Sequence, residues 1–233
     1  MVAFRGSLDG HFGAWGRNFQ CWTDARRFHN CSAWVHHGWI TGYEKLRPRL
    51  LLAARRALEA NPTYRLVVTG HSAGGALASL LVAELATWSA ADSASAASPL
   101  LSRPGAPPPL YITFASPMAG GADLAGAIDA GLAAQDNVLI RVVNSHDPAV
   151  RAPSTLQAGG RVAIPCPTGG EYAHGGQEVW LPVAGDGDMG KARFCESDGS
   201  IDLGAAPVDP GALCSSSLAT RLLNWVRAQS TLQ

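Results

Sequence analysis

One serine of the chain stands in a setting typical of a catalytic nucleophile. Ser72 is at the centre of Gly70-His71-Ser72-Ala73-Gly74, which fits the pattern G-x-S-x-G. The apolar run 66–68 precedes this pentapeptide, and the helix-favouring run 75–78 follows it. We therefore predict a strand, a sharp turn and a helix, an arrangement that exposes the serine hydroxyl for attack on a carbonyl carbon. A serine that only caps the helix is the alternative interpretation.

Two further kinds of group would have to assist this serine. A serine hydroxyl is unreactive until a neighbouring base takes its proton, and the negative oxygen that then forms needs hydrogen-bond donors. The backbone N–H of Ala73, at the predicted start of the helix, is one such donor. Asp147 follows the apolar run 138–143, so we expect it at the carboxyl end of a strand, where parallel sheets place their chemistry. Asp147-Pro148 is also a common turn pair, and a turn role is the alternative.

The elements around these residues alternate between strands and helices. We predict strands over 65–69, 110–115 and 138–143, and helices over 73–87 and 124–134. This alternation is typical of a parallel sheet with right-handed crossovers. The rest of the chain predicts an amphipathic helix over 46–60, a closing helix over 218–226 and an edge strand over 178–182.

The composition predicts a folded domain and argues against several classes of function. Among 233 residues, 47% are hydrophobic and 15% are charged, with 18 basic and 18 acidic side chains. A neutral chain lacks the broad positive field that holds nucleic acids or anionic bilayers. No apolar run approaches the roughly 18 residues of a membrane span. We expect a single domain over 1–233, with a flexible Ala/Ser/Pro-rich surface insertion at 89–109.

The cellular compartment is left open by the sequence. The residues after Met1 form no secretion signal, and a secreted or organellar location stays possible if an upstream segment is missing. The five cysteines are Cys21, Cys31, Cys166, Cys195 and Cys214. Cys21 with Cys31, and Cys195 with Cys214, could each close a short loop in an oxidising compartment, and reduced buried thiols are the equal alternative.

Several blocks of the chain together resemble the class 3 lipases of the α/β-hydrolase fold. The matching blocks are the turn at 68–78, Ala3-Phe4-Arg5-Gly6-Ser7, 35–39, 141–148, and 171–174 with 178–180. The likeness runs from residue 3 to about residue 182. It implies a mostly parallel central sheet with helices on both faces. Because the chain starts abruptly at a central strand, it also implies that the N-terminal part of the fold is missing.

The resemblance also assigns roles to individual residues. Ser72 would be the nucleophile and Asp147 the triad acid, while Ser7 would join Ala73 in the oxyanion hole. For Ser7 the alternative is an ordinary polar residue at a strand end. The family's mobile lid would carry the aromatic residues Phe12, Trp15, Phe19 and Trp22. An aromatic surface loop is the alternative for this segment.

The triad base is the one catalytic group without a clear counterpart. The family's catalytic histidine corresponds to the region 214–225, where this chain has none. His174 is the sole histidine after Asp147, and it matches a family histidine that is not catalytic. Three explanations stay open: a truncated or mis-spliced gene model, whose correct frame would encode a histidine near Arg221; a lipase-like protein without catalysis; or recruitment of His174 as the base.

The expected function is hydrolysis of the carboxylic esters of acyl lipids, in the manner of a triacylglycerol lipase, through an acyl-enzyme. The alternatives are a catalytically silent lipase-like binding protein and an esterase for small or aromatic acid esters. We expect no cofactor, no metal site, no nucleic-acid partner and no transmembrane segment. The expected partners are an acyl lipid or ester and, transiently, a lipid interface. Acyl length, head group and oligomeric state cannot be deduced from the sequence.

Overall fold

The computed structural model describes residues 1–6, 21–28, 31–88, 100, 105–144, 147–153, 172–181 and 193–195. The expected closing helix over 218–226 and most of the expected insertion at 89–109 lie outside these ranges. The single-domain organisation therefore stays a prediction.

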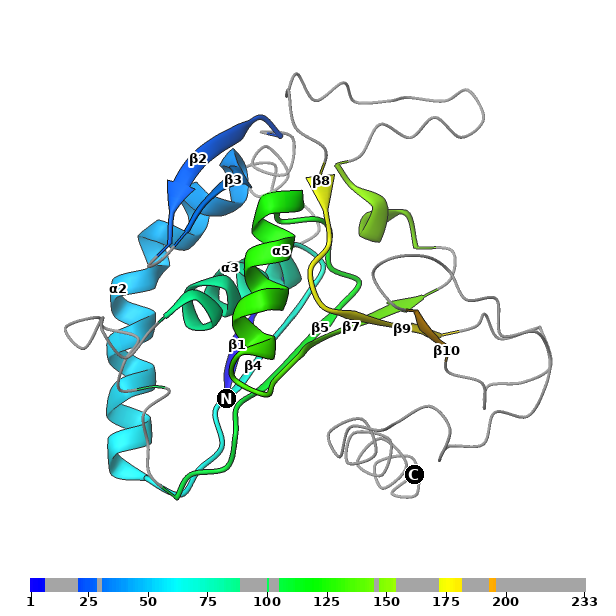
Figure 1. Ribbon diagram of the computed structural model, residues 1–233. Coiled ribbons are helices and arrows are strands. Elements are labelled where there is room, and N and C mark those ends of the chain that lie inside the picture. Colours follow the sequence, from blue (N-terminus) through cyan, green and yellow to red (C-terminus); the bar gives the residue numbers. More distant parts are fainter. Residues whose placement is uncertain are drawn as a thin grey trace, which may run out of the picture. The chain divides into compact units, whose positions relative to one another are not determined.

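A six-stranded sheet forms the centre of the described structure (Figure 1). Its strands, in spatial order, are β1 (Val2–Phe4), β4 (Val67–His71), β5 (Leu110–Phe114), β7 (Leu139–Asn144), β9 (Gln177–Leu181) and β10 (Arg193–Cys195). The first five are parallel, and β10 is antiparallel to β9. The predicted α/β architecture with a mostly parallel sheet is confirmed.

The segment expected to be an edge strand is instead an interior one. β9 pairs with β7 on one side and with β10 on the other. Glu178 is accommodated inside the sheet because its carboxylate pairs with Arg141 on the neighbouring β7, at 2.9 Å.

Two helices lie against the sheet and enclose the core. They are α3 (Ala73–Thr87) and α5 (Ala122–Ala133), which also pack on each other (Figure 1). Val68, Tyr111 and Leu139 stand side by side on β4, β5 and β7, and all are at most 1% exposed. The predicted helix over 73–87 coincides with α3, which is buried almost throughout its length.

A long helix, α2 (His37–Ala60), packs on α3 and starts nine residues before the predicted 46–60. Its start is set by His36, whose Nδ1 accepts a hydrogen bond from the Trp39 N–H at 3.3 Å. The added turns bury Trp39 and Tyr43, so packing of the first turns extends the helix beyond its periodic apolar stripe.

A second, four-stranded antiparallel sheet was not predicted from the sequence. It consists, in spatial order, of β2 (Thr23–Arg27), β3 (Ser32–His36), β6 (Gly120–Gly121) and β8 (Tyr172–Ala173). β2 and β3 form a hairpin, to which the short strands β6 and β8 add from distant parts of the chain.

Of the two possible short-loop bridges, the one between Cys21 and Cys31 is contradicted by the structure. Cys21 is disulfide-bonded, but Cys31 carries a free thiol. Thr23 pairs with His36 at one end of the hairpin and Arg27 pairs with Ser32 at the other. Cys31 is level with Phe28, so Cys21 and Cys31 are separated along the hairpin by about seven residues at roughly 3.4 Å each, which is too far for a disulfide.

Candidate active site

Ser72 occupies a strained turn between β4 and α3. Its backbone has φ 54° and ψ −130°, a conformation with positive φ that residues other than glycine rarely adopt. The turn is held by two hydrogen bonds: the Ser72 N–H donates to the Phe114 carbonyl at 3.0 Å, and the Ser72 carbonyl accepts from the Gly75 N–H at 2.7 Å. The Ser72 side chain makes no capping hydrogen bond, so the interpretation of Ser72 as a simple helix cap is not supported.

The glycines on either side of Ser72 allow three backbone segments to approach closely. A Cβ atom at Gly70 would lie 2.1 Å from the Gly74 carbonyl oxygen, across the turn. A Cβ atom at Gly74 would lie 2.3 Å from the carbonyl oxygen of Phe4, at the end of β1. The G-x-S-x-G spacing therefore joins β4, α3 and the end of β1 at one point.

The structure brings Ser72 and Asp147 to the same edge of the sheet. His71, Phe114 and Val142 are level with one another on β4, β5 and β7. Ser72 follows His71 directly, and Asp147 follows the end of β7. Since β4 and β7 are two strands apart, their carboxyl ends are separated by about 10 Å, a span that an intervening side chain could bridge.

Asp147 also has the turn role that was the alternative. Its Oδ1 accepts a hydrogen bond from the Ala149 N–H at 2.8 Å and caps the short 3-10 helix η2 (Pro148–Arg151). A carboxylate has a second oxygen, so this capping bond leaves Oδ2 for another partner. The turn and an acid role are therefore compatible.

The expected oxyanion donors lie beside the turn, as far as the structure describes them. Ala73 is the first residue of α3, and first-turn N–H groups have no partner within their helix. Gly6 lies against the turn: a Cβ atom placed there would be 3.4 Å from the Ser72 Cβ. Ser7 is the next residue and lies outside the described residues.

His174 is anchored to the turn that carries Asp147. Its Nε2 lies 2.6 Å from the Val150 carbonyl oxygen, which can only accept, so Nε2 carries the proton. Burial, and then the positive charge of Arg141, lowers the pKa of His174 to about 4. The ring is therefore neutral at physiological pH, and its Nε2–H donates its hydrogen bond to the Val150 carbonyl in η2.

The other described histidines have their own surroundings. His36 is fully buried and stacks on Trp39, with ring centroids 4.5 Å apart. His37 Nδ1 is 2.7 Å from Asp24 Oδ2. His71 is exposed beside Ser72. Within the part of the chain that the structure describes, no group of three His, Cys, Asp or Glu side chains is arranged to hold a metal ion.

The predicted lid falls mostly outside the described residues. Phe12, Trp15 and Phe19 are not described. Trp22 is 41% exposed and stacks on His37, at 4.6 Å between ring centroids, just before β2. Trp22 is thus tied to the hairpin and the start of α2.

A cluster of charged side chains was missed by the sequence analysis; Arg141 is buried, and Asp129 and Glu178 are half-buried. Arg141 donates from Nη2 to Glu178 on β9, and Asp129 of α5 accepts a 2.5 Å hydrogen bond from the Gly176 N–H. Burial raises the pKa of Asp129. The available signal was Arg141 itself, an arginine inside the apolar run 138–143.

Comparison with known proteins agrees with this arrangement. The model of the family described as Lipase (class 3) matches residues 1–157, about two thirds of the chain. The chain belongs to the class 3 lipase family. A secreted mono- and diacylglycerol lipase of Fusarium solani is 28% identical over 170 residues, which cover 72% of this chain and 41% of that protein.

Solved lipase structures share the fold. A triacylglycerol lipase with a serine protease triad as its catalytic centre has a TM-score of 0.57 at 23% identity, over 86% of this chain and 63% of that one. Lipase II from Rhizopus niveus has a TM-score of 0.54 at 22% identity, over 77% and 56%. This class 3 lipase family member therefore spans about two fifths to three fifths of the length of these relatives.

Proposed function

We propose that the protein is a serine hydrolase that cleaves the carboxylic esters of acyl lipids through an acyl-enzyme. The observation that carries the proposal is the conformation of Ser72: a non-glycine residue at φ 54°, at the junction of a buried strand and a buried helix, with a side chain free of capping bonds. Strain of this kind persists where the surrounding structure enforces it, and it gathers at functional sites. The Fusarium solani relative supports an acyl-lipid substrate.

In the proposed reaction, the Ser72 hydroxyl attacks the ester carbonyl carbon while a base takes its proton. The Ala73 N–H and Ser7 stabilise the negative oxygen, and each such donor contributes roughly 3 to 4 kcal/mol. The tetrahedral intermediate expels the alcohol, which receives the proton from the base. Water then hydrolyses the acyl-enzyme by the same steps and releases the carboxylic acid. Asp147 orients the base and stabilises its charged form.

His174 fits a positioning role better than the role of the base. Its Nε2 is committed to Val150, one turn along η2 from Asp147. We propose that His174 holds the segment carrying Asp147 against β8 and β9. The structure describes four of the seven histidines, and the base is not assigned to any of these four.

The second candidate is a lipase-like binding protein without catalysis. It is favoured by the environments of three histidines: His36 is buried, and His37 and His174 make hydrogen bonds to groups other than Ser72. Losing a triad base lowers kcat by about 10⁶-fold, so the two candidates differ sharply in reactivity.

A fluorophosphonate probe separates the two candidates. The hydrolase is expected to be labelled within minutes at one site, and Ser72→Ala should abolish the labelling. Ser79→Ala, on the next turns of α3, is the matched control and should be labelled like the unchanged protein. A folded protein whose Ser72 stays unlabelled would refute the hydrolase and favour the binding protein.

The substrate class is tested with nitrophenyl esters of short and long acyl chains, with and without detergent micelles. We expect the long-chain esters to be preferred and micelles to increase the rate, because an acyl-lipid hydrolase works at an interface. A preference for short or aromatic esters, unaffected by micelles, would indicate the small-ester esterase instead.

None of the described helices is long and apolar enough to span a membrane.

A further inference from the structure

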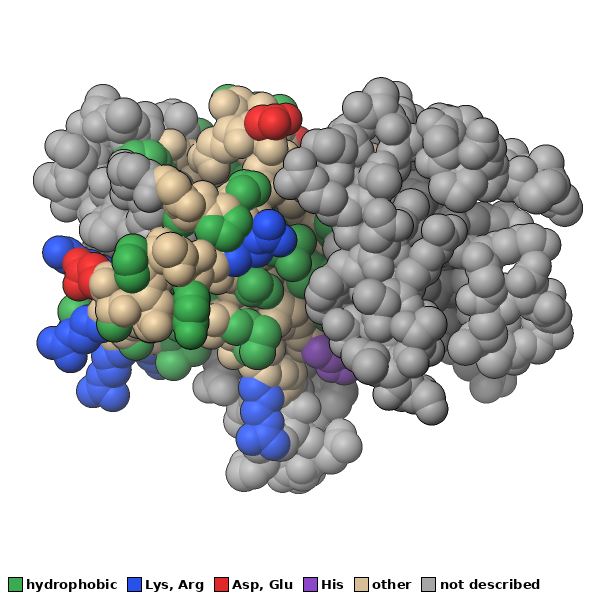
Figure 2. Space-filling view, turned by 90° about the horizontal axis from the view of Figure 1, so that it is seen from below, with side chains coloured by type: hydrophobic (Ala, Val, Ile, Leu, Met, Phe, Trp, Pro, Cys, Tyr) green, Lys and Arg blue, Asp and Glu red, His purple; other side chains and the backbone are tan. Residues whose placement is uncertain are grey.

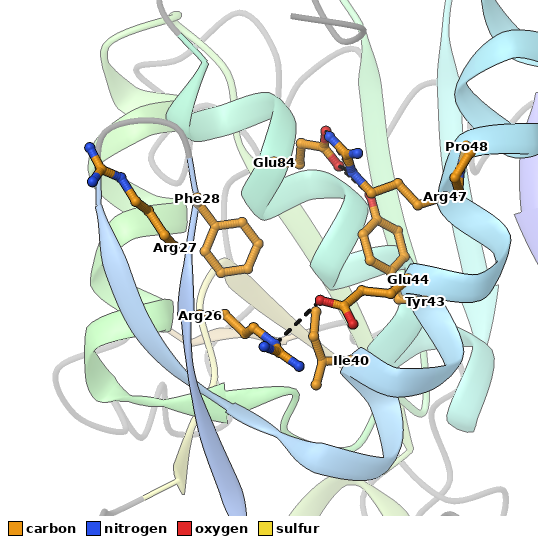
Figure 3. Close-up of a pocket in the computed structure, with 9 residues that line it drawn as sticks. All are labelled: Arg26, Arg27, Phe28, Ile40, Tyr43, Glu44, Arg47, Pro48 and Glu84. Atoms are coloured by element: carbon orange, nitrogen blue, oxygen red, sulfur yellow. Dashed lines mark hydrogen bonds and ion pairs between the residues drawn. The ribbon is translucent and has the colours of Figure 1, made fainter.

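A pocket lies beside the C-terminal half of α3, away from the turn that carries Ser72 (below, the elbow). It is open to solvent, has a volume of about 490 Å³ and is lined by residues of the β2–β3 hairpin, α2 and α3 (Figure 3). Its α3 residue, Glu84, is twelve residues beyond Ser72, which corresponds to about 18 Å along the helix. The volume is within the usual range for small-molecule sites, roughly 300 to 1,000 Å³.

The base of the pocket is a saturated ionic network. Glu84 is 3% exposed, and its Oε2 accepts from the Tyr43 hydroxyl at 2.6 Å and from Arg47 Nε at 2.8 Å. Burial, followed by the charge of Glu84, raises the pKa of Tyr43 far above its usual value, so the phenol stays a donor. The negative charge of Glu84 is thus already compensated, and it does not call for a cationic ligand.

The walls combine an apolar surface with further guanidinium groups. Phe28 and Ile40 are 8% and 3% exposed, and the Phe28 ring projects from the hairpin toward α2 (Figure 3). Arg26 and Arg27 also line the pocket. The Arg26 Nε is buried without a hydrogen bond to the described residues, although it lies 3.3 Å from a carboxylate oxygen of Glu44.

The charge around the pocket favours an anion. Three arginines (Arg26, Arg27 and Arg47) and two glutamates (Glu44 and Glu84) line the pocket, a surplus of one positive charge. A space-filling view from below shows basic side chains on the side where the C-terminal half of α2 lies, away from the pocket (Figure 2). Two carboxylates compete with an anion for Arg26: Glu44 lies 3.3 Å from its Nε and Asp24 lies 3.8 Å from its Nη2. The side chains of Glu44 and Arg26 are 49% and 37% exposed. Exposed ion pairs contribute little net stability, so a bound anion can replace Glu44 on Arg26.

We propose that this pocket is a non-catalytic binding site for an amphipathic carboxylate, a fatty-acid anion. The apolar chain lies against Phe28 and Ile40, and the carboxylate is held by Arg26. The choice of a carboxylate rests on the proposed function, since ester hydrolysis releases one. The site would let the product of the reaction bind away from Ser72.

The test measures binding of decanoate to the full chain carrying Ser72→Ala, by titration calorimetry at monomeric ligand concentrations. Because this variant cannot turn over substrate, the result is independent of the hydrolase proposal. We expect saturable binding that weakens at least tenfold in Arg26→Gln. Arg56→Gln, the matched loss of one exposed α2 arginine, should leave the affinity unchanged.

Uncharged and cationic chains complete the experiment. Decanol and decyltrimethylammonium should each bind at least tenfold more weakly than decanoate. In the chain with intact Ser72, saturating decanoate should leave fluorophosphonate labelling unaffected if that labelling occurs. The proposal is overturned by the absence of decanoate binding, by equal affinity for decanol, or by binding that is insensitive to Arg26→Gln.

Discussion

The strain at Ser72 can be measured as a difference in stability between two variants. Both Ser72→Ala and Ser72→Gly remove the hydroxyl, but only glycine adopts φ 54° without steric cost. Both variants therefore lack the nucleophilic hydroxyl, and they differ in the backbone strain at position 72. We expect Ser72→Gly to be the more stable of the two, in contrast to the usual order within helices.

The magnitude follows from two opposing terms. A non-glycine residue in such a conformation costs about 1 to 3 kcal/mol, which glycine recovers. The greater freedom of glycine in the unfolded chain costs about 0.5 to 1 kcal/mol. The net expectation is that Ser72→Gly exceeds Ser72→Ala by about 1 kcal/mol in the free energy of unfolding.

Urea unfolding followed by tryptophan fluorescence provides the assay. With a slope of about 2 kcal/mol per molar urea, the midpoint should be about 0.5 M higher for Ser72→Gly. The control is Ser79, in the interior of α3, where the glycine variant should be about 1 kcal/mol less stable than the alanine variant. If the glycine variant is also the less stable one at position 72, the serine is not held in a strained turn and the argument for the elbow fails.

Three further predictions concern the packing and charges around the site. Gly74→Ala places a Cβ 2.3 Å from the backbone of β1. It should lower the free energy of unfolding by about 1 to 3 kcal/mol and abolish probe labelling. The control is Gly126→Ala, where nothing lies within 4 Å of the added Cβ: its thermal stability should be unchanged or higher, and its labelling unchanged. The pKa of His174 is lowered in the folded state to about 4, so between pH 6.5 and 4 the unfolded chain binds the extra proton. Stability should thus fall on acidification by up to about 1.4 kcal/mol per pH unit from this group, and the advantage of the unchanged protein over His174→Gln in urea midpoints should shrink over this window; a constant advantage would contradict the assignment. Tyr43→Phe removes a 2.6 Å hydrogen bond to the buried Glu84 carboxylate and should cost about 1.5 to 3 kcal/mol in urea unfolding, with a change below about 0.5 kcal/mol contradicting the network.

The predictions that succeeded depended on local patterns. The helix over 73–87 was correct because it lies between a glycine turn and an Ala/Ser-rich segment and is rich in alanine and leucine. The strand predictions for β4, β5 and β7 were correct within two residues at each end, since short apolar runs with turn residues at both ends are typical of buried parallel strands.

The features that were missed depend on contacts between distant residues. The β2–β3 hairpin is completed by β6 and β8, whose two-residue strands carry no signal of their own. β9 is interior because Arg141, 37 residues earlier, compensates Glu178. The link from His174 to Val150 likewise joins elements that the chain separates by 24 residues.

The order of residues by itself determined the elbow around Ser72. A turn with positive φ needs glycines beside it and small residues in the first turn of the following helix, and both requirements are local. It also determined the alternation of strands and helices, because periodicity is a property of neighbours along the chain. Only the tertiary structure decided which strands adjoin, that Ser72 and Asp147 share an edge, and that His174 faces η2. These follow from pairing and burial of surfaces far apart in the chain, whose energies no local pattern contains.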